Sequence, residues 1–171
     1  MQTKDHISDC IGLLNQAAAM IARLDDCVFR ALTPISARGS VGGHLRHILD
    51  FYSSFIEGLP QSRIDYNQRL RDVRVEQDRF YALRKLDDCV IDLKSLALLS
   101  ANEHLLVCTE EGSSWSRSSV LRELDFLRSH TIHHFALIAM LLRLHEVDPG
   151  EEFGVAPSTL KHWKQETVCA Q

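Results

Sequence analysis

The sequence predicts an all-α protein: one four-helix-bundle domain over residues 1–171, with a long crossover connection between its second and third helices. Apolar residues recur at three- and four-residue steps in four long segments, which is the period of an amphipathic helix. Hardly any segment alternates between apolar and polar residues as a half-buried strand does. A chain of 171 residues is long enough to bury one helical core.

The first helix is expected over residues 3–31. Its apolar positions follow the helical period, and they are Ile7, Ile11, Leu14, Ala18, Ile21, Leu24 and Val28. Pro34 in the segment TPIS ends this helix, because proline lacks a backbone N–H and clashes with the preceding turn.

The second helix is expected to begin after Ser40, a residue type that caps helix N-termini. It runs to Gly58, where this glycine and Pro60 stop it. Gly42 and Gly43 lie in its first turn, which weakens the helix locally but permits close approach of another backbone.

The crossover connection is expected over residues 60–76, PQSRIDYNQRLRDVRVE, which are rich in Arg and Asp and contain no long periodic run. Connections of this length are more often functional than idle. The third helix is expected from Gln77 to Ser100, since its apolar residues again follow the helical period.

The stretch Glu103–Trp115 is short and alternating, with a Glu-Gly turn signal, and predicts a small hairpin or extended excursion. Ser118 or Ser119 then caps a fourth helix that continues to about Glu146. The tail, residues 151–171, is expected to dock as a terminal segment without a helix of useful length.

The overall charge and composition exclude several classes of protein. A net charge of −4 and a pI near 6.1 argue against a generic nucleic-acid binder, which usually carries a clustered positive field. No apolar run approaches the roughly 18–20 residues needed to cross a bilayer. The first residues, MQTKDHISDCIGLL, include Asp9 and show no signal-cleavage segment, and the five cysteines form no C-x-x-C pair. A cytoplasmic protein is therefore expected.

The fourth helix carries the segment SHTIHHFALI, in which His130 and His134 are four residues apart and share one helix face. That face also carries Leu127, Ile138 and Leu141, so both rings are expected to point inward. Two buried imidazoles would each need a polar partner, and one shared metal ion satisfies both. The alternative is a hydrogen-bonded core histidine beside surface histidines.

A third metal ligand is available on the second helix, where the segment GGHLRHILDFY contains His44 and His47. His44 lies nearer the centre of the apolar stripe, whereas His47 lies at its flank near Phe51. Periodicity does not choose between the two. Three imidazole ligands suit one divalent ion of zinc, nickel or iron(II), which is the expected cofactor.

The segments GHLRHILDFY and SHTIHHFALI, at this separation in a helical chain, resemble the DinB-like superfamily of metal-binding bundles. Matched residue by residue, the resemblance assigns His47, His130 and His134 as the metal ligands. It spans essentially the whole chain, but this sequence reads HHFALI where many members read H-H-x-G-Q. His133 lies about 100° around the helix from His134 and is not expected to bind the ion.

The resemblance implies a metal-dependent transferase that activates a low-molecular-weight thiol, or a metal-dependent hydrolase, acting on a small molecule. The alternative is a non-catalytic, stress-associated protein whose ion stabilises the bundle. A homodimer is expected, because bundles of this type commonly pair through a helix face. Neither a nucleic acid nor a membrane is an expected partner.

Substrate-binding residues are expected in the crossover, where Tyr66, Arg69 and Arg71 are suited to holding an anionic substrate. Arginine grips a carboxylate through two parallel hydrogen bonds. The alternative is a charged loop that only faces water.

Two carboxylates near the histidines are weak candidates for catalysis. Asp50 follows His47 by three residues and either accepts a hydrogen bond from an imidazole or faces water. Glu123 lies one heptad before His130 and is either a general base or a helix cap.

Overall fold

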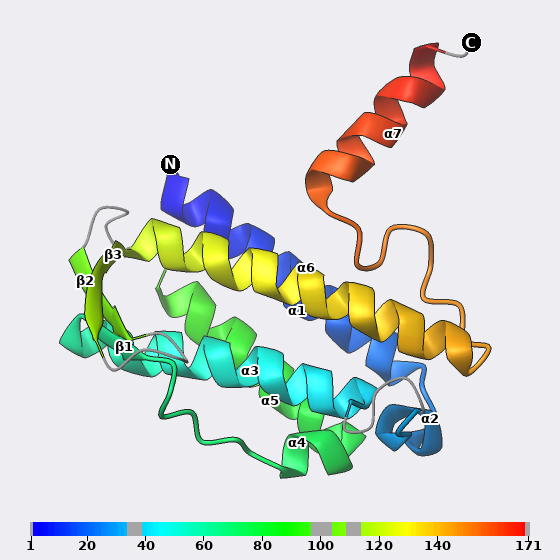
Figure 1. Cartoon of the computed structure of the whole chain (residues 1–171), viewed down its shortest axis with the longest axis horizontal. Helices are drawn as coiled ribbons and strands as arrows, with labels where there is room; N and C mark the ends of the chain where they lie inside the picture. Colours follow the sequence, from blue (N-terminus) through cyan, green and yellow to red (C-terminus); the bar gives the residue numbers. More distant parts are fainter. Residues whose placement is uncertain (1, 34–38, 97–103, 109–113, 170–171) are drawn as a thin grey trace.

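Four long helices form the body of the protein, and a small sheet lies at the end where α3 stops and α6 begins (Figure 1). This computed structural model describes residues 2–33, 39–96, 104–108 and 114–169. The long helices are α1 (Gln2–Ala22), α3 (Val41–Gly58), α5 (Arg79–Ser95) and α6 (Val120–Leu144). Both α1 and α3 pack against α5 and α6, so the core lies between all four helices.

The prediction of an all-α four-helix bundle is wrong, because the described residues also form a three-stranded mixed sheet in the order β1-β2-β3. Strand β2 (His104–Cys108) pairs antiparallel with β3 (Trp115–Ser119). This pairing agrees with the small hairpin predicted near residues 103–115. Strand β1 (Arg63–Asp65) pairs parallel with β2 and comes from the crossover. Three residues are too few to show a strand period, although Ile64 at the centre of β1 is fully buried.

The predicted first helix is divided in two. Helix α1 ends at Ala22, and a short α2 spans Asp26–Arg30. Leu24, between the two helices, is buried. The apolar pattern therefore continues across the break, and periodicity does not reveal that the helix stops there. The guanidinium of Arg79, on α5, donates to the carbonyl oxygens of Ile21 and Ala22 at 3.3 Å each. The last carbonyl groups of α1 thus find their hydrogen-bond donor on a distant helix. No local sequence pattern predicts such a helix end.

The first turn of α3 forms as predicted, since the hydroxyl oxygen of Ser40 accepts a hydrogen bond from the Gly43 N–H at 2.9 Å. Gly42 lies against the backbone of Glu76, and a Cβ at position 42 would lie 2.6 Å from the Glu76 carbonyl oxygen. Glu76 belongs to α4 (Arg74–Gln77), a short helix within the crossover. The crossover therefore has regular structure and packs directly on α3.

Helices α3 and α6 begin and end close to their predicted limits, whereas α5 ends before the predicted Ser100. Helix α3 leads into a 3-10 turn, η1 (Leu59–Gln61). Helix α5 ends at Ser95, and residues 97–100 of the predicted third helix lie outside the described residues. Helix α6 begins after Ser119, whose hydroxyl oxygen accepts from the Arg122 N–H at 3.3 Å, so the predicted cap is confirmed.

The tail contains a helix, contrary to the prediction. Helix α7 (Pro157–Cys169) projects away from the body (Figure 1). Its proline stands at the first helical position, where a missing N–H costs nothing. The segment before α7 is docked, because the ring of Phe153 stacks on that of Phe135 of α6 at 4.6 Å between centroids.

The apolar side chains of the four long helices face one another. Each helix contributes fully or almost fully buried leucines, among them Leu14, Leu45, Leu86 and Leu124. Over the parts of the chain that the structure describes, no helix combines the length and the apolar character that spanning a lipid bilayer requires.

We predict that Gly42→Ala destabilises the protein by about 1–3 kcal/mol, because the added methyl group would overlap the Glu76 backbone and the ring of Phe29. The free energy of unfolding from urea denaturation measures this effect. Gly12→Ala is the matched control: a Cβ at position 12 meets nothing within 4 Å, so this change should stabilise α1 by about 0.5–1 kcal/mol. Equal effects of the two substitutions would contradict the close approach at Gly42.

Candidate metal centre

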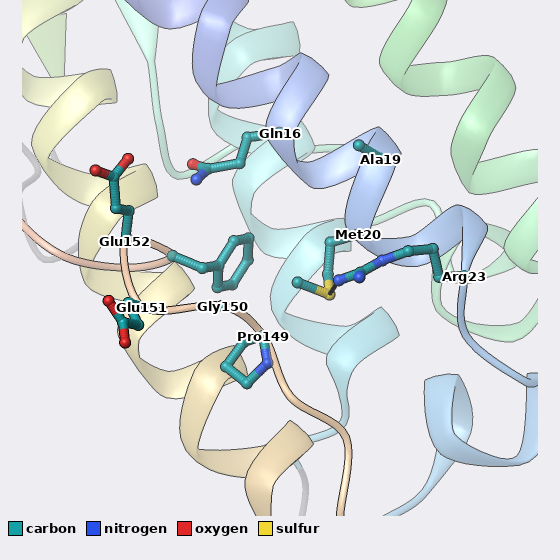
Figure 2. Close-up of a pocket in the computed structure, with 9 residues that line it drawn as sticks. Gln16, Ala19, Met20, Arg23, Pro149, Gly150, Glu151 and Glu152 are labelled. Carbon is teal, nitrogen blue, oxygen red and sulfur yellow. Dashed lines mark hydrogen bonds between the residues drawn. The ribbon is translucent and has the colours of Figure 1, made fainter.

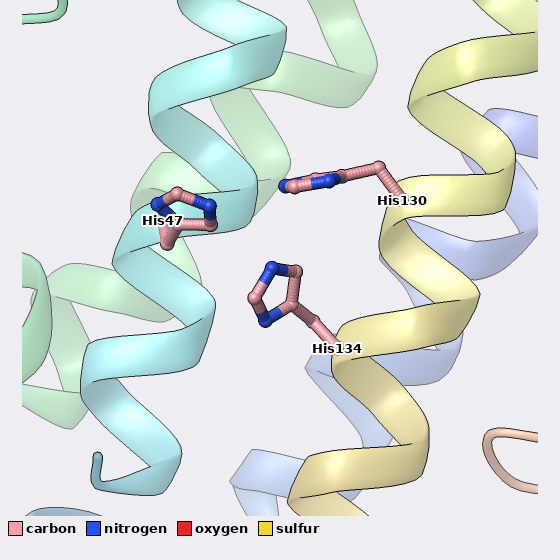
Figure 3. Close-up of side chains that lie close together, drawn as sticks. All are labelled: His47, His130 and His134. Atoms are coloured by element: carbon pink, nitrogen blue, oxygen red, sulfur yellow. The ribbon is translucent and has the colours of Figure 1, made fainter. Parts of the chain in front are cut away.

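The structure brings His47, His130 and His134 together between α3 and α6 (Figure 3). Each side chain is half-buried and offers one ring nitrogen, and the three nitrogens lie within 4.8 Å of one another. The ring centroids of His47 are 5.0 Å from His130 and 4.7 Å from His134, and the latter two are 4.5 Å apart. These three residues are hereafter called the histidine triad.

Helix α6 presents two of these rings because a spacing of four residues places them one turn apart on the same face. Thr131, which follows His130 directly, lies on a neighbouring face of α6 and is fully buried. Its hydroxyl donates to the Leu127 carbonyl at 2.7 Å and lies 3.3 Å from the hydroxyl of Tyr52 on α3. Thr131 thus ties the inner side of α6 to α3 next to the triad.

Aromatic rings enclose one side of the triad. The ring of Phe51 lies 4.3 Å from that of His130 and 5.0 Å from that of His47, measured between centroids. Phe126 lies 5.5 Å from His130, and Tyr66 lies 5.0 Å from Phe51. His130 therefore borders an apolar wall, which sequence analysis missed because its members come from α3, α6 and the crossover.

The triad is electrostatically suited to binding a cation. Burial is the main cause that lowers the pKa of His134 to about 3, and positive charge on the neighbouring histidines His130, His47, His44 and His133 adds to this shift. His134 is therefore neutral near pH 7, and a neutral imidazole is the form that binds metal ions.

His44 and His133 both lie beside His134, outside the triad. The Nδ1 atoms of His44 and His134 are 3.0 Å apart, which is a hydrogen-bonding distance between imidazoles. Burial lowers the pKa of His44, and the nearby charge of His133 lowers it further. The exposed ring of His133 lies 5.2 Å from that of His134. Of the two candidates on α3, the geometry thus groups His47 with His130 and His134.

The carboxylate of Glu123 holds neighbouring elements together. Its side chain is fully buried and lies two helical turns, or about 10 Å along α6, before His130. The hydroxyl of Tyr66 donates to its Oε2 at 3.0 Å, while the hydroxyl of Ser118 and the guanidinium of Arg122 donate to Oε1. Glu123 therefore anchors the crossover and β3 to α6.

Asp50 is buried. The alternative that this side chain faces water is therefore wrong. Its Oδ2 accepts from the Arg46 guanidinium at 2.8 Å, and the same guanidinium donates to Glu76 at 2.9 Å. Burial raises the pKa of Asp50, and the charges of Arg46 and Arg69 only partly oppose that effect. Asp50 thus belongs to a charge network that holds the crossover against α3.

The three predicted substrate-binding residues lie in different environments. Tyr66 is buried, and its hydroxyl is already used by Glu123. Arg71 is exposed, with a left-handed φ of 49°. Arg69 lies over Phe51: its Cζ atom is 4.4 Å from the centroid of this ring, which contacts His130.

A separate pocket of about 520 Å³ lies between α1 and residues 149–153 (Figure 2). Met20 and Phe153 supply its apolar surface, and the exposed Arg23 and Glu152 carry charge at its rim. None of the described residues that line it belongs to the histidine triad. The pocket is therefore not part of the candidate metal centre.

Comparisons with known proteins do not place the chain in a family. No family model matches the chain, and no solved structure matches it. FK506-binding protein 5 of the fungus Rhizopus delemar is 29% identical over 108 residues, which are 60% of this chain and 28% of that protein. This chain thus spans less than a third of its curated relative. No family is shown.

We predict that Glu123→Ala lowers the free energy of unfolding by about 2–4 kcal/mol, because it leaves the buried hydroxyl of Tyr66 without its acceptor. Tyr66→Phe should cost less, and the double variant should cost less than the sum of the two, since both lose the same hydrogen bond. Arg122→Ala is the control: Arg122 is exposed, and Tyr66 and Ser118 still donate to Glu123 without it, so this change should cost less than Glu123→Ala. Unchanged stability of Glu123→Ala would contradict the anchoring role.

Proposed function

We propose that the protein binds one divalent metal ion through His47, His130 and His134 and uses it in a reaction on a small molecule. The observation that carries this proposal is the approach of three ligand nitrogens from two helices to within 4.8 Å of one another. Zinc, nickel and iron(II) are the ions that an all-imidazole set suits best.

Three protein ligands favour a catalytic site over a closed structural one. Structural zinc sites usually take four protein ligands, whereas catalytic sites take three and keep a position for substrate or water. When bound, such an ion lowers the pKa of a neighbouring water or thiol and so supplies a nucleophile near neutral pH. The chain itself supplies neutral imidazole ligands and, through Phe51 and Phe126, an apolar wall beside His130.

The reaction class we propose is transfer to or from a low-molecular-weight thiol, or hydrolysis, as the resemblance to the DinB-like superfamily implies. The side chain that we propose to attract an anionic substrate group is Arg69. Its guanidinium lies over the face of Phe51, whose ring contacts both His47 and His130. Tyr66 is a weaker candidate, because its hydroxyl donates to Glu123.

The alternative proposal is a non-catalytic protein whose ion stabilises the contact between α3 and α6. One specific observation favours it. Asp50 and Glu123, the two carboxylates considered as catalytic groups, are both buried and already engaged: Asp50 pairs with Arg46, and Glu123 pairs with Arg122 and accepts from Tyr66. The two proposals share the same metal ligands and differ in what the ion does.

We predict that protein purified without an affinity tag or added metal contains about one equivalent of zinc, nickel or iron by elemental analysis, and that His134→Ala abolishes this stoichiometric binding. Removal of one of three ligands leaves two, too few for tight retention of the ion. His104→Ala is the matched control, because His104 is an exposed histidine on β2 and its loss should leave the metal content unchanged. A His134→Ala variant that retains its ion at unchanged affinity would exclude the triad.

We predict that removal of the ion by a chelator lowers the midpoint of thermal unfolding but leaves the far-UV circular dichroism at 25 °C unchanged. An ion that binds only the folded state adds stability by mass action, whereas the apolar core between the four helices does not include the triad. Loss of helical signal on chelation, regained on adding the ion, would instead support the non-catalytic alternative.

A further inference from the structure

His44 is oriented toward a member of the histidine triad and is not itself a member. Its Nδ1 atom lies 3.0 Å from the Nδ1 atom of His134, and the two ring centroids are 5.1 Å apart. The nitrogens of the triad all lie within 4.8 Å of one another, but no such group of the described residues includes His44. The contact therefore joins His44 to one ligand and not to the centre of the triad.

This contact assigns different tasks to the two nitrogens of His134. Because Nδ1 is hydrogen-bonded to His44, Nε2 is the nitrogen left to bind an ion. Figure 3 agrees: one ring nitrogen of His134 faces the space between His47 and His130, and the other faces away from it. A neutral imidazole that binds through Nε2 keeps its proton on Nδ1, so Nδ1 of His134 donates and Nδ1 of His44 accepts.

We propose that His44 is a positioning residue for the metal centre: it accepts a hydrogen bond from Nδ1–H of His134 and thereby fixes the tautomer and ring orientation that present Nε2 to the ion. This inference rests on the metal binding proposed above. Metal-binding histidines usually donate their second N–H to a fixed acceptor, and that acceptor makes the ligand more basic. Here the acceptor is the imidazole of His44, whereas a carboxylate or a carbonyl group more often has this role.

The backbone around His44 supports this role. His44 lies in the first turns of α3, where its own N–H donates to the Ser40 carbonyl at 3.0 Å. The Ser40 side chain caps the same turn, and the contact of Gly42 with the Glu76 backbone holds that turn in place. His47 follows about one turn later, so both histidines of α3 meet His134 from successive turns.

Titration of the metal-free protein with cobalt(II), and with zinc(II) in competition against a chromophoric chelator, tests the proposal on three variants. His44→Leu removes the acceptor but keeps a side chain of similar reach, and it should weaken binding about 10–100-fold while retaining one site per chain. His44→Asn places an amide oxygen at the position of Nδ1 and should restore most of the affinity. His47→Asn removes a ligand and should abolish stoichiometric binding.

Two spectra supply readouts that a merely structural role of His44 would not change. The visible absorption bands of the cobalt(II) form should shift in His44→Leu and return toward the parent spectrum in His44→Asn. In the zinc form of the parent, ¹⁵N NMR of labelled histidine should show a protonated Nδ1 and a zinc-bound Nε2 at His134. Unfolding of each metal-free variant checks that all of them remain folded.

The outcomes separate this inference from the proposed function. Parent-like affinity and cobalt spectrum in His44→Leu, or zinc on Nδ1 of His134, would overturn the role of His44 and leave the triad intact. Loss of stoichiometric binding in His44→Leu, as complete as in His47→Asn, would make His44 a ligand and also overturn it. A parent protein that binds neither metal would reject the proposed function and this inference together.

Discussion

The packing of α3 against α6 is the contact on which the rest of the candidate site depends. His47 lies on one of these helices and His130 and His134 lie on the other, so their rings meet only if the two helices keep one register. Buried apolar side chains press the helices together, and the hydroxyls of Thr131 and Tyr52, 3.3 Å apart, fix their relative position inside the core. The polar contact and the triad lie on neighbouring faces of α6.

The sheet and the crossover are attached to this helix pair by buried charges. Glu123 accepts hydrogen bonds from Tyr66, which follows β1, and from Ser118 of β3, so one carboxylate joins two strands to α6. Arg46 donates to Asp50 and Glu76 and holds α4 on α3. Buried ion pairs are costly to break because the remaining charge is left without its partner. Asp50 and Glu123 therefore contribute to the shape around the triad.

Sequence reasoning succeeded where the signal is local and repetitive. The limits of α3 followed from Ser40, Gly58 and a helical apolar period, and the pairing of two histidines on α6 followed from their spacing. It failed where the deciding partner is distant. Helix α1 ends at Ala22, where Arg79 of α5 donates to its last carbonyl group. Strand β1 forms because its three residues pair with β2, which lies about 40 residues later in the chain. An apolar period continues across such a break, and a three-residue strand has no measurable period.

The sequence by itself determined the four amphipathic helices and the face of α6 that presents His130 and His134, because helix geometry converts residue spacing directly into direction. Periodicity did not choose between His44 and His47, since it records only the angle around the helix, and the preference for His47 came from the resemblance to the DinB-like superfamily alone. The tertiary structure decided between them: the height at which α6 crosses α3 groups His47 with the other two rings and sets His44 against Nδ1 of His134. The tertiary structure also makes Glu123, a candidate general base or helix cap in the sequence, a buried anchor, because only the folded chain brings Tyr66 and Ser118 to it.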